Sequence, residues 1–153
     1  MMADATRIAD RLAIRELNDA FAHGLDHGDV ELFLAIFTGD VTYRNGARKL
    51  SGMAEMEPFF RARAKSPRLS RHIYSGLRIA FDGTDRATGT STWVTFAGEG
   101  TPPIEGTMPF VVSDVRDVYV RGADGWRIAS RTISPVFQSA EVPTLAATMG
   151  KTP

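Results

Sequence analysis

Four long β-type segments follow one another in the second half of the sequence, and they constrain the fold most. The segments are rich in Val, Ile, Thr, Tyr, Trp and Phe, and short turn sequences such as those at 82–85 and 122–125 separate them. Short connections join neighbouring strands in opposite directions, so the pattern predicts an antiparallel sheet. The last two segments are long for strands, which predicts bends or bulges in them. The segments span about 70–82, 87–98, 106–121 and 125–138.

The first part of the chain has the periodicity of a helix from Asp4 to about Asp26. Asp4 or Thr6 is expected to cap its start, and Gly24 and Gly28 are expected to loosen its end. The apolar positions lie three or four residues apart and predict one buried face: Ile8, Leu12, Ile14, Leu17, Phe21 and Leu25.

Two shorter helices and one strand are expected between this helix and the β-type segments. Asp29–Phe37 predicts a helix that Asp29 caps, and Val41–Arg44 predicts a short strand. Ser51 is expected to cap a third helix, which Pro58 delays or kinks and which Ser66-Pro67 closes.

Helices followed by a run of antiparallel strands indicate the α+β class. We expect a strongly curved antiparallel sheet in the form of a cone, with three N-terminal helices packed on its concave face and a small-molecule pocket in the hollow. The domain is expected to span 1–138, and 139–153 is expected to be an extended C-terminal tail.

The composition narrows the classes of function. Lys plus Arg and Asp plus Glu both number 18, so no overall positive field favours nucleic acid or an anionic membrane. The absence of cysteine excludes thiolate nucleophiles and Cys-ligated metals. There is no glycine-rich nucleotide motif and no apolar run of about 20 residues, and the first twelve residues are too polar and charged to resemble a secretory signal. We therefore expect a cytoplasmic protein without a cofactor.

Three segments, taken together and in this order, resemble the SnoaL-like branch of the nuclear transport factor 2-like superfamily. They are LAIRELNDAFAHGLDHGDVELFLAIFTGDVTY, SRHIYSGLRIAFDGTDRATGTSTW and VRDVYVRGADGWRIASR. The resemblance implies a cystatin-like fold related to bile-acid dehydratases, scytalone dehydratases and ketosteroid isomerases. Members include dehydratases, isomerases and cyclases that act on hydrophobic ring compounds, and also non-catalytic proteins.

The resemblance also implies a catalytic group. In dehydratase-like members, a Tyr and an Asp near the end of the first helix act with a His on a strand; here Asp26 and His72 match the Asp and the His, whereas Phe21 stands at the Tyr position. A mechanism that needs this hydroxyl would require Tyr43 or Tyr119 to supply it from another wall. From the residues alone, Asp26 could merely end a helix and His72 merely edge a strand. A histidine paired with a carboxylate has a fixed tautomer and is suited to act as a general base.

Further substrate-binding residues are expected on the strands. If the third segment alternates, Asp117 and Tyr119 share a face with Val115 and point into the hollow; the alternative places Asp117 in water. Trp93 and Tyr43 are expected to form aromatic walls, although such residues are often simply core.

Arg131 is a candidate for binding a substrate carboxylate, carbonyl or phenolate. Strict alternation after Trp126 and Ile128 would place Ser130, and not Arg131, on the inner face, so this role requires a bulge.

Two other patterns have simpler interpretations. His23 and His27 lie four residues apart and could bind zinc, but no third ligand is evident and we expect no metal site. A basic run could hold an anionic group such as the phosphates of a coenzyme thioester, although a solvated helix face is its usual explanation. The run consists of Arg61, Arg63, Lys65, Arg68 and Arg71.

These observations predict a cofactor-independent lyase, of dehydratase type, or an isomerase that acts on a hydrophobic cyclic or aromatic small molecule by His/Asp acid–base catalysis. One alternative is a non-catalytic small-molecule-binding module, which the missing tyrosine at Phe21 favours. Another is an assembly subunit, of β type, of a ring-hydroxylating oxygenase. The outer face of a curved sheet needs cover, so we expect a homo-oligomer, with a dimer favoured.

Overall fold

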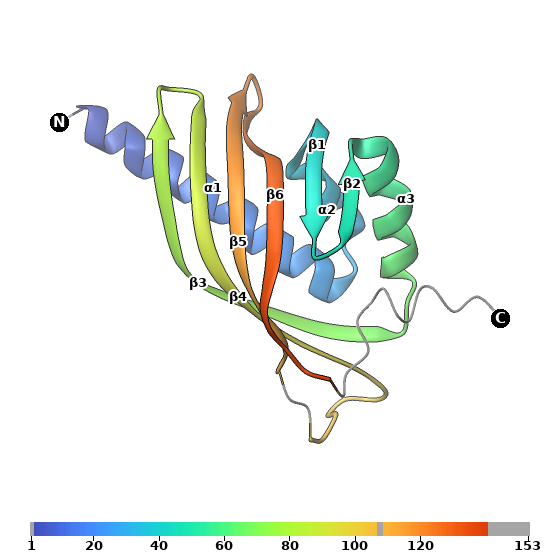
Figure 1. Cartoon of the computed structure of the whole chain (residues 1–153). Coiled ribbons are helices and arrows are strands. Elements are labelled where there is room, and N and C mark those ends of the chain that lie inside the picture. The colour runs from blue at the N-terminus through green and yellow to red at the C-terminus, as the bar shows by residue number, and fades with distance from the viewer. Residues whose placement is uncertain (1, 107–108, 141–153) are drawn as a thin grey trace.

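The computed structural model describes residues 2–106 and 109–140 and has the expected α+β architecture. Its six strands form one curved, open sheet in the order β2-β1-β6-β5-β4-β3, with the helices on its concave side (Figure 1). β1 runs parallel to β6, and all other neighbours are antiparallel. The elements are α1 (Met2–His27), α2 (Val30–Ala35), β1 (Phe37–Asn45), β2 (Arg48–Ser51), α3 (Met53–Ala64), β3 (Arg68–Asp82), β4 (Arg86–Glu99), β5 (Pro109–Gly122) and β6 (Gly125–Gln138).

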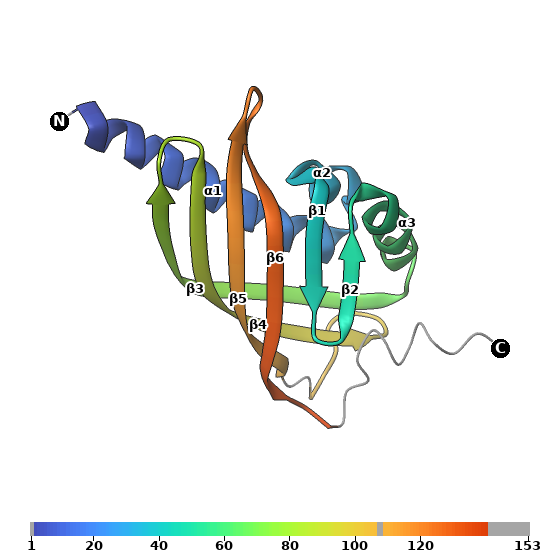
Figure 2. The same ribbon diagram turned by 45° about the horizontal axis from the view of Figure 1, so that its top comes forward.

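The four predicted β-type segments are confirmed as β3 to β6, with the expected irregularities. The sequence did not indicate β2, since four residues beside a turn carry little periodic signal. β3 bends strongly, and its register against β4 shifts between Ser75 and Arg78. Gly76 lies in this shift with a φ of 67°, a conformation that glycine adopts without strain. Beyond this bend, the first part of β3 runs across the base of the molecule toward α3 (Figure 2).

α1 lies across the concave face and contacts β3 and β6. Ile14 and Phe21 are buried, but Ile8 and Leu12, which belong to the same predicted stripe, are each 60% exposed. The expectation of one buried face was wrong there because α1 turns Asp10 and Ile14 toward the sheet, where both are buried. Ile8 and Leu12 lie two residues from Asp10, roughly 200° around the helix, and therefore face outward. Near the start of α1, Arg7 donates a hydrogen bond to the carbonyl of Gly83, in the β3–β4 turn, over 2.7 Å.

The end of α1 is closely packed, contrary to the loosened end that its glycines predicted. The helix continues to His27, and Gly24 faces α2 at short range. A Cβ at position 24 would lie 2.8 Å from Cβ of Phe33 and 3.0 Å from the carbonyl oxygen of Asp29. Gly24 therefore allows the close approach of the two helices that sets the position of the next turn of α1, which carries Asp26.

The caps of the shorter helices differ in how well they were predicted. Asp29 caps α2 as expected, since its Oδ1 accepts from the backbone N–H of Leu32 over 3.1 Å. The N-cap of α3 is Gly52 and not Ser51, which instead donates its backbone N–H to Oε2 of Glu55. The helix accommodates Pro58 in its second turn.

None of the helices within the described ranges is long and apolar enough to cross a membrane. The predicted tail at 139–153 lies outside the described residues except for its first two positions, 139 and 140.

Gly24→Ala should destabilise the fold. The new methyl would meet Phe33 and the Asp29 carbonyl at 2.8 and 3.0 Å, and such overpacking costs about 1–3 kcal/mol. This cost outweighs the gain of about 1 kcal/mol that Ala brings to a helix over Gly. Urea unfolding measures the difference. Gly39→Ala, where nothing lies within 4 Å of the added carbon, is the matched control; equal stability of the two variants would contradict the close contact.

Candidate active site

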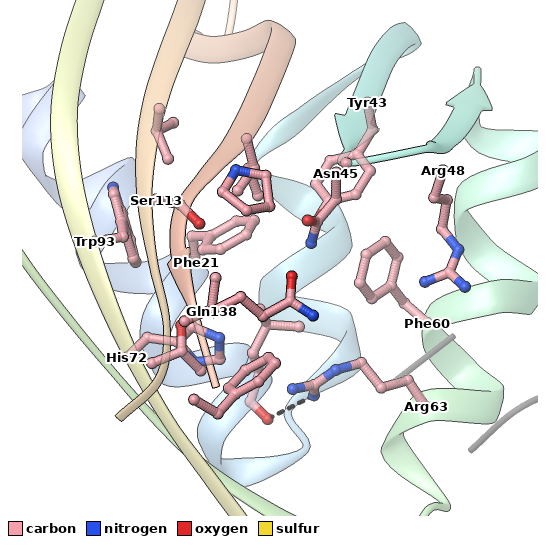
Figure 3. A pocket seen from close by; sticks show the side chains of 18 of the residues that line it. Phe21, Tyr43, Asn45, Arg48, Phe60, Arg63, His72, Trp93, Ser113 and Gln138 are labelled. Atoms are coloured by element: carbon pink, nitrogen blue, oxygen red, sulfur yellow. Dashed lines mark hydrogen bonds between the residues drawn. The ribbon is translucent and has the colours of Figure 1, made fainter. Parts of the chain in front are cut away.

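A cavity of about 310 Å³ opens between the inner face of the sheet, the end of α1 and the inner side of α3 (Figure 3). This volume suits a small organic molecule. Most of its wall is aromatic or aliphatic, and a smaller part is polar. The main apolar lining residues are Phe21, Leu25, Tyr43, Phe59, Phe60, Trp93, Phe110, Val111, Val115 and Ile133. The polar side chains are Asn45, Arg48, Arg63, Arg68, His72, Thr95, Ser113 and Gln138.

Asp26 and His72 lie in direct contact at this cavity. Nδ1 of His72 lies 2.6 Å from Oδ1 of Asp26, and the side chains are 12% and 7% exposed, respectively. Oδ2 of Asp26 accepts the backbone N–H of His72 over 2.8 Å, and Oδ1 also accepts from the hydroxyl of Ser70 over 2.9 Å. One carboxylate at the end of α1 therefore fixes both the backbone and the ring at the start of β3.

The roles of the two groups differ because only His72 lines the cavity. Burial by itself would raise the pKa of Asp26, but the hydrogen bonds and charge of His72, with the Ser70 hydroxyl, hold the pKa of this carboxyl below its ordinary value. Asp26 is thus an anion whose oxygens are occupied. In this geometry Asp26 can orient the ring of His72, but it does not reach a molecule bound in the cavity. Nε2 of His72 has no hydrogen-bond partner among the described residues.

The predicted aromatic walls lie around this histidine. The ring centroids of Phe21 and Trp93 are each 6.4 Å from that of His72, in edge-on geometry. Tyr43 lines the cavity from β1 and is only 3% exposed. Burial raises the pKa of Tyr43, although the hydrogen bond of the Asn45 side chain and the positive charge of Arg131 oppose this effect, so the phenol stays protonated and can donate a hydrogen bond.

Asp117, Tyr119 and Arg131 do not line the cavity, contrary to the expectation that they face it. They form a buried network in which Nε and Nη2 of Arg131 donate to the two oxygens of Asp117, each over 2.8 Å. The Tyr119 hydroxyl donates to Asp117 over 2.7 Å, and Asn18 of α1 bonds both Tyr119 and Arg131. The alternative that placed Asp117 in water was also wrong, because its side chain is 1% exposed.

The bulge on which the prediction for Arg131 depended is present. Val118 pairs with Ser130, but Tyr119 pairs with Ile128, so β6 has one extra residue at this point. Ile128 and Arg131 are consequently both fully buried, where strict alternation would have turned Arg131 outward.

Arg131 lies directly behind the aromatic lining. Its Cζ is 4.2 Å from the Phe21 ring centroid and 5.3 Å from that of Trp93. The guanidinium is thus a support for the two walls, by cation–π contact, and is separated from the cavity by them.

The family is decided by a match over most of the chain. The model of the SnoaL-like domain matches residues 6–132. The chain belongs to the SnoaL-like domain family. This confirms the resemblance inferred from the three sequence segments. No curated protein matches the sequence significantly.

Solved structures share the fold of this SnoaL-like protein. One is a provisionally named scytalone dehydratase from Novosphingobium aromaticivorans, with a TM-score of 0.80, 16% identity and coverage of 98% of this chain and 99% of that one. A nuclear transport factor 2-like protein with a cystatin-like fold from the same organism has a TM-score of 0.74, 24% identity and coverage of 97% and 92%. The β subunit of a provisionally assigned aromatic-ring-hydroxylating dioxygenase, also from that organism, has a TM-score of 0.75, 19% identity and coverage of 94% and 98%. These likenesses establish the fold.

The sequence reasoning did not identify Ser70 or Asn18 as parts of the site. Ser70 could have been found, since it lies two residues before His72 on the same strand and therefore on the same face. Asn18 carries no such signal. The rings of His23 and His27 lie 4.5 Å apart, and the described part of the chain contains no group of three or more His, Cys, Asp or Glu arranged to hold a metal.

The Asp26 contacts predict a pH-dependent contribution to stability. The pKa of Asp26 is lowered from its ordinary value of 3.8, so its contribution is complete above that value and is lost as the pH falls through the folded-state pKa. The difference in unfolding free energy between the wild type and Asp26→Asn should therefore shrink below pH 3.8. Urea unfolding at a series of pH values measures it. A constant difference over this range would show that Asp26 gains nothing from its ionised form.

Proposed function

We propose that this SnoaL-like protein is a cofactor-independent lyase, of dehydratase type, or an isomerase acting on a hydrophobic cyclic or aromatic molecule. His72 is its general acid and base, and Asp26 orients His72. The observation that carries the proposal is the 2.6 Å contact between Nδ1 of His72 and Oδ1 of Asp26. The imidazole ring of His72 lines an aromatic cavity, and Asp26 lies on the side of this ring away from the cavity. A positioned base in a water-poor cavity is what proton transfer at carbon requires.

The carboxylate selects the useful tautomer of His72. A proton on Nδ1 faces the negative Oδ1 of Asp26, so Nε2 keeps its lone pair for the substrate. Nε2 takes a proton from carbon next to a carbonyl, and the electron pair of that C–H bond moves into the carbonyl to form an enolate. When the enolate collapses, the imidazolium returns the proton either to a departing hydroxyl, which leaves as water, or to another carbon. The first outcome is a dehydration and the second an isomerisation.

Tyr43 is the group proposed to stabilise the enolate oxygen. It is the tyrosine that lines the cavity, it is protonated, and it reaches the cavity from β1, on a different element from His72. A phenol can therefore act here although Phe21 stands at the position where related dehydratases have tyrosine. Phe21 and Trp93 pack against the ring of the substrate and exclude water.

Deuterium exchange tests the proposal with a panel of cyclic ketones and hydroxyketones. The protein is incubated with each compound in deuterium oxide, and nuclear magnetic resonance and mass spectrometry follow deuterium uptake beside the carbonyl and loss of water. His72→Ala should slow either reaction about 100-fold or more, since it removes the base. Asp26→Asn should slow it similarly. The amide that replaces the carboxylate either turns its NH2 group toward an N–H of His72 or requires the ring proton of His72 to move from Nδ1 to Nε2.

His23→Ala is the matched control, because His23 is an exposed histidine of α1 that does not line the cavity. Its rate should equal that of the wild type. If His72→Ala exchanges as fast as the wild type, His72 is not the base. Binding of panel members by a wild type that catalyses neither exchange nor water loss would favour the non-catalytic binding module.

We also propose that the protein forms a homodimer through the outer face of the sheet. Four apolar residues pair across neighbouring strands on this face, directly behind the His72 side of the cavity, and two of them, Ile73 and Phe137, are 59% and 69% exposed. Such a row favours contact with a second sheet. The row is Ile73, Val94, Val112 and Phe137.

Sedimentation velocity at micromolar concentration should give a dimer for the wild type and a monomer for Phe137→Asp, which places a charge in the row. Leu12→Asp is the control, since Leu12 is 60% exposed but lies on α1. A monomeric wild type, or an unchanged Phe137→Asp variant, would contradict the proposed interface.

A further inference from the structure

The charged side chains that line the cavity, among the described residues, are all positive. Among the described residues that line it are Arg48, Arg63 and Arg68, but no Asp or Glu. Figure 3 shows Arg48 and Arg63 extending from β2 and α3 on one side of the cavity, with His72 and Trp93 on the other. The cavity therefore has a catalytic wall and a cationic wall opposite each other.

Arg63 is a cation held in place without a carboxylate. Its Nη1 donates to the carbonyl of Leu25 over 3.0 Å, and its Nη2 donates to the hydroxyl of Ser70 over 3.2 Å. Burial lowers the pKa of Arg63, and within the described ranges no carboxylate oxygen lies within 4.0 Å of it. These two bonds use two of the five N–H groups of the guanidinium and leave the others for a ligand.

The flat face of the Arg48 guanidinium packs on the ring of Phe59. Its Cζ lies 4.3 Å from the centroid of the Phe59 ring, and its guanidinium has no hydrogen bond or ion pair in the part of the chain that the structure describes. Cation–π contact uses the face of a guanidinium, so the N–H groups at its edge remain available to a planar anion.

Arg68 adds to the positive field of the same wall. Burial and the neighbouring charge of Arg63 lower the pKa of Arg68, while Glu99 opposes this effect. Its Cζ lies 4.6 Å from the Phe110 ring centroid. Two guanidinium groups that repel each other beside a cavity are stabilised when an anion binds there.

Two other arginines of the basic run are engaged elsewhere. Arg61 pairs with Glu31 and Glu57 at the surface, over 2.7 and 2.8 Å. Arg71 donates to the backbone carbonyls of Ser70 and Asp26. The explanation of this run as a solvated helix face thus holds for Arg61 but not for Arg63 and Arg68, which line the cavity.

We propose that the molecule bound in this cavity carries an anionic oxygen group, a carboxylate or a phosphate, which Arg48 and Arg63 bind while the apolar ring lies against Phe21 and Trp93. Only the statement that the bound molecule is the substrate rests on the proposed function. The binding preference itself does not depend on catalysis. An anion held at the cationic wall places the ring between that wall and His72.

Isothermal titration calorimetry with matched naphthalene probes tests the proposal. Naphthalenecarboxylate and naphthyl phosphate carry the anionic groups, and naphthalenecarboxamide is the neutral match of the carboxylate. The wild type should bind at least one of the anions about tenfold or more tightly than the amide, because bidentate charged hydrogen bonds replace neutral ones. The preferred anion distinguishes a carboxylate from a phosphate.

Arg48→Gln should lose most of this preference, with about tenfold weaker binding of the preferred anion and unchanged binding of the amide. Arg44→Gln is the matched control, since Arg44 is an exposed arginine of the same β1–β2 hairpin that does not line the cavity; it should bind like the wild type. His72→Ala should retain the preference, which separates this proposal from the catalytic one.

Equal affinity of the wild type for anions and amide, including no measurable binding of either, would overturn the proposal. So would an equal loss of anion and amide binding in Arg48→Gln, because that result would mean a change in cavity shape.

Discussion

The Asp26 carboxylate is the contact on which the arrangement of the site depends. It accepts from the ring of His72, from the backbone N–H of the same residue and from the hydroxyl of Ser70. These bonds join the end of α1 to the start of β3, two elements that are 46 residues apart at the contact. A carboxylate is suited to this position because its oxygens accept several hydrogen bonds and donate none.

The inner wall of the cavity depends on a second buried charge pair. Arg131 and Asp117 are almost fully buried, and removing two such charges from water is costly unless their hydrogen bonds are satisfied. Asn18 and Tyr119 satisfy most of them, although Nη1 of Arg131 has no hydrogen-bond partner among the described residues. The guanidinium lies against Phe21 and Trp93, so this pair stabilises the surface against which an apolar ring would rest.

The two networks are connected through α1. Phe21, which covers Arg131, lies more than one turn before Asp26 on the same helix, and Gly24 between them allows α2 to pack closely. The position of α1 against the sheet therefore affects both the aromatic wall and the orientation of His72. Arg63 extends this connection to α3, because it donates to Ser70, which in turn donates to Asp26. A group bound at the cationic wall is thus linked by hydrogen bonds to the proposed base.

The sequence by itself determined the α+β class and the order of the elements other than β2, because these follow from local periodicity. The pairing of Asp26 with His72 was expected only from short segments that resemble a family. Tertiary structure decided which polar residues reach the cavity. Alternation could not place Arg131, since a single extra residue in β6 reverses the side of the sheet on which it lies. The burial of Arg63 and Arg68 depends on the bend of β3 under α3, which no local pattern of charges encodes.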